Sequence, residues 1–200
     1  MTLKNPELIL LGVGGHALSC IDVIEQQGLF SIAGLVSSSR SGVGLTHCGY
    51  RVIACDSDLK KLSDIYRFAF IGIGQIKLPN LRVNMFERLI NLGFELPYLQ
   101  SPFAYVSPHS KIGPGTIIMH GAIVNAGVEI GANCIINSGA LVEHDVSIGD
   151  HCHISTRAIL NGSVVVGSKT FIGSGCVVRE GVTIHPENFL GMGSLVRRDQ

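Results

Sequence analysis

Residues 106–130 read VSPHSKIGPGTIIMHGAIVNAGVEI, and every sixth residue of this stretch is aliphatic. The same period runs unbroken to residue 196, at Val106, Ile112, Ile118, Val124, Ile130, Ile136, Val142, Ile148, Ile154, Leu160, Val166, Ile172, Val178, Ile184, Leu190 and Val196. An α-helix repeats about every 3.6 residues and a flat strand about every 2, so neither explains a period of six. A hexapeptide repeat is typical of a parallel β-helix, which we therefore predict for the C-terminal half.

The positions beside each aliphatic residue support this prediction. The residue two places before it is usually small, as at Ala104, Ser110, Thr116, Ala122, Cys134, Ala140, Cys152, Ala158, Thr170, Cys176 and Ser194. Glycine recurs one place after it, as at Gly113, Gly131, Gly149, Gly167, Gly173 and Gly191. We expect the aliphatic side chains to point inward, the small residues to fit tight corners, and the glycines to accept turn dihedrals that other residues resist.

Composition disfavours several classes of protein. The 200 residues have no net formal charge and only 15 Lys and Arg, so a broadly basic surface for nucleic acid is not indicated. No run of about 18 apolar residues is present, as a membrane-spanning helix requires. The N-terminal apolar run is too short and too rich in glycine for a signal peptide. We expect a cytoplasmic protein, whose six cysteines, with no CxxC pair, stay reduced.

The first hundred residues alternate strands and helices. Residues 7–13 predict a buried strand, the following pattern predicts a helix that ends near Gly28, and residues 32–36 predict a second strand. Further strands are expected at residues 50–54, 67–73 and 96–99, with a helix over 79–92 and a loop over 37–49. We therefore divide the chain into a small Rossmann-like α/β domain with a parallel sheet of about four strands, residues 1–102, and a β-helix domain, residues 103–200.

Three loops of the first domain are expected at the carboxyl ends of its strands, where parallel sheets bind ligands. They comprise residues 12–16, 37–39 and 72–75. A glycine-rich turn before a helix attracts phosphate, because free N–H groups and the helix dipole point at it. NAD binding is disfavoured, since serines 37–39 stand where an acidic residue would hold the ribose. A turn that only connects strand and helix is the alternative.

His144 and Asp145 are the strongest candidates for chemistry. A neutral imidazole is a suitable general base at neutral pH, and a carboxylate can fix its tautomer. Neighbours on a strand point to opposite faces, so direct contact between these two needs corner geometry or a second subunit. The alternatives are a surface histidine on a turn and a metal site with His151 and His153, for which no third ligand has an obvious spacing.

The whole chain resembles the bacterial sugar O/N-acyltransferases, typified by N-acetyltransferases of nucleotide-linked 4-amino-4,6-dideoxy sugars. The resemblance rests on the Gly-x-Gly-Gly-His-Ala opening, the Ile-Gly-Ile-Gly strand end, and residues 137–145 and 151–155. It implies a left-handed parallel β-helix with three hexads per coil and about five coils. Cys134 and Cys152, one coil apart, should then stack.

The resemblance also implies an acetyl-CoA-dependent acetyltransferase without a metal. His144 would be the general base and Asp145 its acidic partner. The acetyl-CoA site would include His153, Gly162, Ser174 and Met192, and the nucleotide sugar would meet Gly15, His16, Ser37, Gly74 and Asn137. Family members are homotrimers with active sites between adjacent prisms, so we expect the same assembly.

Two departures leave parts of the function open. Relatives usually carry an acidic pair where Ser37 and Ser38 stand, so the sequence does not define the nucleotide or the sugar. Relatives also usually carry a Gly-x-Pro-Ala segment near CoA, and its absence before Gln200 predicts a truncated C-terminus or weak cofactor binding. Because one histidine base serves an amine or a hydroxyl, a sialic-acid O-acetyltransferase is the alternative function. A non-catalytic β-helix binding protein is the second alternative.

Overall fold

The computed structural model describes residues 5–76 and 79–200, and the chain forms two compact units. The first unit contains the residues up to Gly74 together with Leu81–Pro97, and the second contains Gln75–Asn80 and Tyr98–Gln200. The main division therefore falls between residues 97 and 98, whereas the sequence predicts 102 and 103. The difference arises because the strand β6 (Leu99–Gln100) pairs with a strand of the β-helix.

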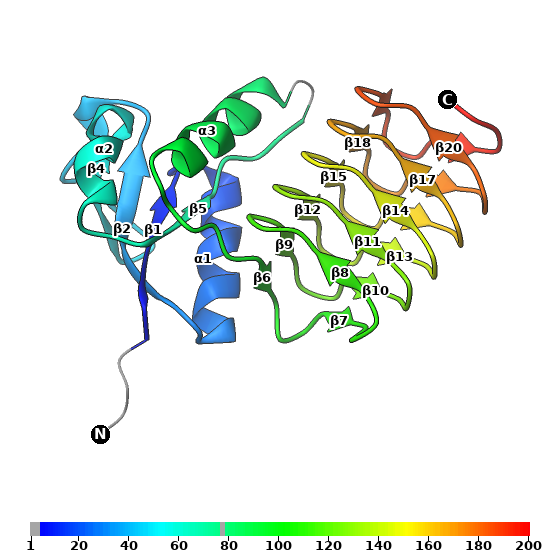
Figure 1. Cartoon of the computed structure of the whole chain (residues 1–200), viewed down its shortest axis with the longest axis horizontal. Coiled ribbons are helices and arrows are strands. Elements are labelled where there is room, and N and C mark those ends of the chain that lie inside the picture. Colours follow the sequence, from blue (N-terminus) through cyan, green and yellow to red (C-terminus); the bar gives the residue numbers. More distant parts are fainter. Residues whose placement is uncertain (1–4, 77–78) are drawn as a thin grey trace. The chain divides into compact units, whose positions relative to one another are not determined.

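The first unit is built on a five-stranded sheet in the order β3-β4-β2-β1-β5 (Figure 1). Its strands are β1 (Glu7–Leu11), β2 (Ser31–Ser37), β3 (Thr46–His47), β4 (Tyr50–Cys55) and β5 (Phe68–Ile71). Four of them pair in parallel, as predicted. The edge strand β3 lies where the sequence predicts a loop, and it pairs antiparallel with β4. Cys48 and Gly49 close this hairpin with positive φ angles of 45° and 81°.

Helices lie between the strands of the first unit and after its last strand, β5. They are α1 (Gly15–Gln27), α2 (Leu59–Ser63) and α3 (Asn80–Asn91), with 3₁₀ turns η1 (Arg40–Gly42) and η2 (Asp56–Asp58). Helix α1 ends just before Gly28, as predicted: the Gly28 N–H donates to Ile24 O at 3.0 Å, and the left-handed φ of 66° at Gly28 then turns the chain out of the helix. The strand predicted at residues 96–99 is not formed: Glu95 makes one bridge to Phe68, and Leu99 belongs to β6.

The second unit is a β-helix whose coils run from β6 to β22 (Figure 1). Its other strands are β7 (Tyr105–Val106), β8 (Lys111–Ile112), β9 (Ile117–Ile118), β10 (Ile123–Val124), β11 (Glu129–Ile130), β12 (Ile135–Ile136), β13 (Leu141–Val142), β14 (Ser147–Ile148), β15 (His153–Ile154), β16 (Ile159–Leu160), β17 (Val165–Val166), β18 (Phe171–Ile172), β19 (Val177–Val178), β20 (Thr183–Ile184), β21 (Phe189–Leu190) and β22 (Leu195–Val196). They form three parallel sheets, ordered β22-β19-β16-β13-β10-β7, β20-β17-β14-β11-β8 and β21-β18-β15-β12-β9-β6. Partners lie 18 residues apart, as Val124 and Val142 do, so each coil has the predicted length.

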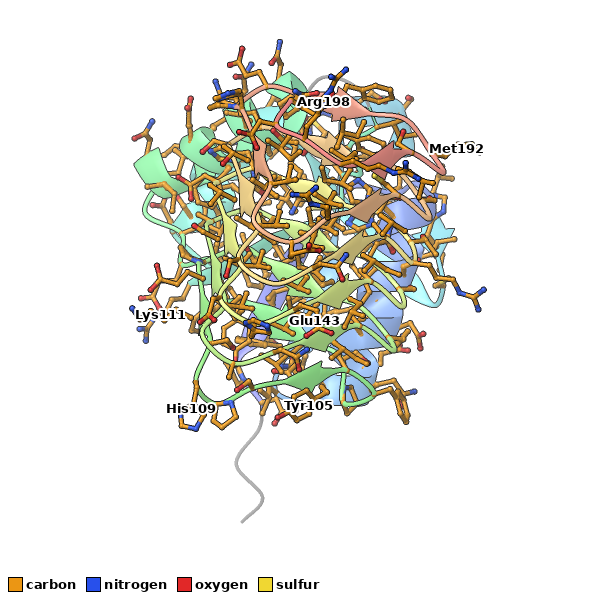
Figure 2. The ribbon with its side chains drawn as sticks, turned by 90° about the vertical axis from the view of Figure 1, so that its right-hand side faces the viewer. Tyr105, His109, Lys111, Glu143, Met192 and Arg198 are labelled. Atoms are coloured by element: carbon orange, nitrogen blue, oxygen red, sulfur yellow. The ribbon has the colours of Figure 1, made fainter. Side chains whose placement is uncertain are left out.

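The predicted aliphatic positions form the core of the β-helix. From β7 to β22 the second residue of each strand points inward, and Val124, Val142 and Leu160 are fully buried. Burying such a side chain stabilises the fold by about 1.5–3 kcal/mol. Cys134 and Cys152 stack as predicted, since the Cys152 N–H donates to Cys134 Sγ at 3.4 Å. Figure 2 shows the outer side chains of this unit, with Tyr105 and His109 near one end and Met192 and Arg198 near the other.

Candidate active site

His144 lies in the turn between β13 and β14, at a corner of the prism. The next residue, Asp145, has a φ of 59°, in the left-handed region. This backbone turn brings the carboxylate back to the imidazole, with 2.9 Å between His144 Nδ1 and Asp145 Oδ2. The corner geometry that the contact requires is therefore present within one chain. When Nδ1–H donates to Asp145, Nε2 keeps the lone pair that can take a proton.

A groove of about 570 Å³ opens beside His144. Its lining residues are Glu143, His144, Asn161, Gly162, Ser163, Glu180 and Gly181. Gly162 lies one coil from His144 and stacks on its ring: a Cβ at position 162 would lie 2.7 Å from the Nε2 and Cε1 atoms. Only glycine leaves the imidazole in its present place. Beside it, Asn125 Nδ2 donates to Glu143 Oε2 at 2.8 Å and holds that carboxylate.

Asn137 lies at a different corner, in the turn between β12 and β13. Its Oδ1 accepts the Ser138 N–H at 2.8 Å, and its Nδ2 lies 3.1 Å from His153 Nε2. His153 is only 7% exposed, and Phe171 packs edge-on against its ring with centroids 5.1 Å apart. The predicted cofactor histidine therefore lies behind Asn137 rather than in the open groove.

The predicted residues of the β-helix fall on two edges of the prism. We call the turns after β13 and β16, residues 143–146 and 161–164, the histidine edge; it holds His144, Asp145 and Gly162. We call the turns after β12, β15, β18 and β21, residues 137–140, 155–158, 173–176 and 191–194, the asparagine edge; it holds Asn137, Ser174 and Met192. The sheet that contains β13 separates the two edges, so one chain does not bring these two groups together.

The predicted glycine loops of the first unit meet at the carboxyl ends of β1 and β5. Gly12 has a φ of 114°, and a Cβ there would lie 3.0 Å from the Gly72 carbonyl oxygen. A Cβ at Gly74 would lie 3.3 Å from His16 Cβ. His16, Gly74 and the turn that begins α1 at Gly15 therefore form one cluster, as the sequence predicts for a ligand-binding edge.

Ser37 ends β2 at the same edge of the sheet, but its side chain does not face outward. The residue is 3% exposed, and its hydroxyl donates to the Ser39 carbonyl at 2.5 Å. Sequence analysis expects Ser37 to contact the nucleotide sugar. Its hydroxyl group is instead buried and already hydrogen-bonded within the chain.

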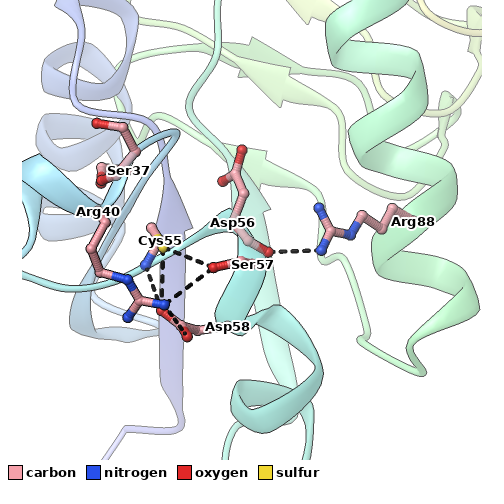
Figure 3. Close-up of polar contacts among 8 residues, drawn as sticks. Ser37, Arg40, Cys55, Asp56, Ser57, Asp58 and Arg88 are labelled. Atoms are coloured by element: carbon pink, nitrogen blue, oxygen red, sulfur yellow. Dashed lines mark hydrogen bonds and ion pairs between the residues drawn. The ribbon is translucent and has the colours of Figure 1, made fainter.

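Acidic groups stand instead at the end of the next strand, β4 (Figure 3). Asp58 pairs with Arg40 at 3.0 Å, and its hydrogen bond from the Cys55 N–H lowers the pKa of the carboxyl group. Burial raises the pKa of Asp56, and the nearby Arg88 opposes that effect. The Asp-Ser-Asp sequence directly after a predicted strand is the signal that could have found them.

Both halves of the chain match known protein families. Residues 7–89 match the PglD N-terminal domain family, and residues 109–144 and 127–162 match the bacterial transferase hexapeptide family. A histidine mutant of perosamine N-acetyltransferase from Caulobacter crescentus, solved with CoA and GDP-perosamine, is 32% identical over 100% of this chain and 92% of its own, with a TM-score of 0.90. The chain belongs to the bacterial sugar acyltransferase family. No match is found among curated protein sequences.

A second sugar acyltransferase gives the same result. The acetyltransferase domain of PglB from Neisseria gonorrhoeae FA1090 is 28% identical over 98% of this chain and 93% of its own, with a TM-score of 0.88. The family that the sequence resembles and the left-handed β-helix that this resemblance implies are therefore confirmed.

Cys20 and Cys176 are among the buried cysteines of this sugar acyltransferase. Burial raises the pKa of Cys20 to about 12 and that of Cys176 to about 11, so both remain thiols at neutral pH. Within residues 5–76 and 79–200, no group of three or more His, Cys, Asp and Glu side chains is arranged to hold a metal. His151 Nδ1 instead lies 2.9 Å from Asn133 Nδ2. Over the same residues, no helix has the length and apolar character needed to span a membrane.

Proposed function

We propose that this sugar acyltransferase moves the acetyl group of acetyl-CoA to the amine of a nucleotide-linked amino sugar. One observation carries the proposal: His144 holds Asp145 through Nδ1 while its Nε2 borders the groove beside Gly162. The family supplies the reaction class, because the 32% identical relative is a perosamine N-acetyltransferase solved with CoA and a nucleotide sugar.

His144 Nε2 removes a proton from the attacking nitrogen as that nitrogen forms a bond to the thioester carbonyl carbon. The carbon–sulfur bond then breaks, and CoA leaves as the thiol after taking up a proton. Asp145 stabilises the imidazolium that forms in between. Base catalysis of this kind contributes about 10²–10⁴-fold, and correct positioning of the two substrates contributes further.

The asparagine edge is our proposed site for acetyl-CoA. Asn137, which the resemblance assigns to the nucleotide sugar, lies on this edge, and we therefore place it at the acetyl-CoA site instead. The Ser174 hydroxyl, 2.9 Å from Ser155 Oγ, lies two coils along the same edge. Met192 follows one coil further and is 79% exposed, which suits contact with an extended pantetheine arm. His153 supports this edge from behind, through Asn137.

We further propose a homotrimer in which the histidine edge of one chain meets the asparagine edge of the next. The sheet between the two edges presents an outward apolar stripe, comprising Tyr105, Ile123, Leu141, Ile159, Val177 and Leu195. Tyr105, Ile123 and Leu195 are 57%, 41% and 65% exposed. The sheet that contains β8 instead presents polar groups such as the Lys111–Glu129 ion pair. A contiguous exposed apolar patch of this kind marks a protein interface.

The first unit is our proposed site for the nucleotide part of the acceptor. We expect Gly15→Val to raise the KM for the nucleotide sugar about tenfold or more, with little change in the KM for acetyl-CoA. A Cβ at Gly15 would meet no atom within 4 Å, so the fold tolerates the side chain while the space for a phosphate is lost. Steady-state kinetics with each substrate varied in turn would check this. A change confined to acetyl-CoA would mean that the two sites are exchanged.

Release of free thiol from acetyl-CoA tests the reaction itself. The assay would offer UDP- and GDP-linked 4-amino sugars beside free sialic acid, with His144→Ala as the control. Release that requires an amino sugar and is lost in the variant supports the proposal and names the nucleotide. Thiol release with sialic acid alone would instead identify a sialic-acid O-acetyltransferase. No thiol release with any acceptor would favour a non-catalytic binding protein.

A further inference from the structure

Gln75 joins the two units in sequence but belongs to the β-helix unit. It directly follows Gly74, at the end of the loop after β5, and is only 3% exposed. Its side-chain Nε2 donates to the His151 carbonyl at 3.1 Å, and its own carbonyl lies 2.5 Å from His153 Nδ1. The residue therefore contacts strand β15 and the turn before it with both its backbone and its side chain.

These contacts define the tautomer of His153. A backbone carbonyl can only accept, so His153 Nδ1 must carry a hydrogen and donate it to Gln75. The neutral ring then has its lone pair on Nε2, 3.1 Å from Asn137 Nδ2. The Asn137 amide cannot be reversed, because its Oδ1 accepts the Ser138 N–H at 2.8 Å. With His153 protonated at Nδ1 and Asn137 Nδ2 facing His153 Nε2, each of these three hydrogen bonds has one donor and one acceptor.

We propose that Gln75 is a positioning residue for the acetyl-donor site. It fixes the His153 tautomer, and the Nε2 lone pair of His153 in turn accepts from the Asn137 amide and holds that side chain in place on the asparagine edge. The proposal rests on the proposed function, which places acetyl-CoA at that edge. It also gives the loop after β5 a second role, because the residue after Gly74 orders a group that serves the other substrate.

A stabilising role alone does not explain this side chain. Gln75 Oε1 is buried and has no hydrogen-bond partner among residues 5–76 and 79–200. The unsatisfied Oε1 lowers stability, whereas the hydrogen bond from Nε2 to the His151 carbonyl raises it, so the two effects offset each other and the side chain adds little net stability. Gln75→Met therefore separates the two roles: it removes the unsatisfied oxygen, but it also removes the donor that anchors the segment to the His151 carbonyl.

We expect Gln75→Met to keep the melting temperature of the wild type while the KM for acetyl-CoA rises about five- to tenfold, the loss typical of one buried hydrogen bond. The KM for the nucleotide sugar should change less than about twofold. ¹⁵N NMR of the histidine-labelled protein should show His153 protonated at Nδ1 in the wild type and a mixture of tautomers in the variant. Gln100→Met is the matched control, because Gln100 lies in β6, at the far end of the sheet that contains β15. Its melting temperature, its KM for acetyl-CoA and its His153 tautomer should equal those of the wild type.

Gln75→Glu gives a second test, since it keeps the length and an acceptor but loses the Nε2 donor; it should shift the same two measurements. An unchanged His153 tautomer together with an unchanged KM for acetyl-CoA, in either variant, would overturn the positioning role. A fall in melting temperature with no change in tautomer would also overturn it, in favour of a structural role. If the wild type releases no thiol, the proposed function fails, and the NMR measurement still decides the role of Gln75.

Discussion

Replacement of His144 by alanine is expected to lower kcat at least about 100-fold while the fold and the assembly stay intact. The imidazole is 64% exposed at a corner and contributes nothing to the core, so its loss should leave the melting temperature nearly unchanged. The KM values should change little, because the base acts mainly in the transition state. Thiol release measured at saturating substrates, with thermal unfolding alongside, checks both parts.

His109→Ala is the matched control for that variant. His109 is also an exposed histidine in a turn between the same two sheets, near the first coil of the β-helix, but it lies outside the groove. It should keep wild-type turnover. Near-normal activity in His144→Ala would remove His144 from the role of base.

Mixing two inactive variants should restore activity if each site is built from two chains. His144→Ala destroys the histidine edge and Asn137→Ala the asparagine edge, so either homotrimer should retain at most a few per cent of wild-type activity. In a randomly mixed cyclic trimer, each site draws one edge from each neighbour, and about one quarter of the sites receive two intact edges. Co-refolded equal amounts should therefore regain about 25% of wild-type activity.

A negative result would be equally informative. If both edges served one site within a single chain, every site in the mixture would carry one of the two substitutions, and no activity would return. The double variant His144→Ala/Asn137→Ala, co-refolded with wild type in the same proportion, provides the control for losses during refolding. Light scattering must give a trimeric mass for the mixture, since a monomer with full activity would contradict the interface.

The β-helix could be predicted almost residue by residue because its physics is local and periodic. The period of six defines the core, and the three hexads per coil that the family resemblance implies place Val124 beside Val142 and Gly162 on His144. The first unit was less predictable. The hairpin of β3 depends on positive φ angles at Cys48 and Gly49, and helix α2 is too short to show a periodic pattern.

The candidate site was predictable in its residue types but not in its connections. The pair His144–Asp145 could be selected from the sequence, yet their contact depends on the left-handed backbone of Asp145. The Ser37 hydroxyl is turned inward by a local hydrogen bond to the Ser39 carbonyl, and the role of Gln75 depends on a contact with His153, which is far along the chain. Such contacts leave no periodic signal, and residue type alone does not reveal them.

The register of 18 residues also restricts how such a chain can change in length. Deleting one residue from a coil would shift every later position by one place, so aliphatic side chains would turn outward and polar ones inward. Deleting a whole coil would instead keep every column aligned and shorten the prism by about 4.8 Å. Evolution and protein engineering can therefore lengthen or shorten the groove only in steps of one coil, and any finer adjustment of its reach must come from exchanging side chains along its edges.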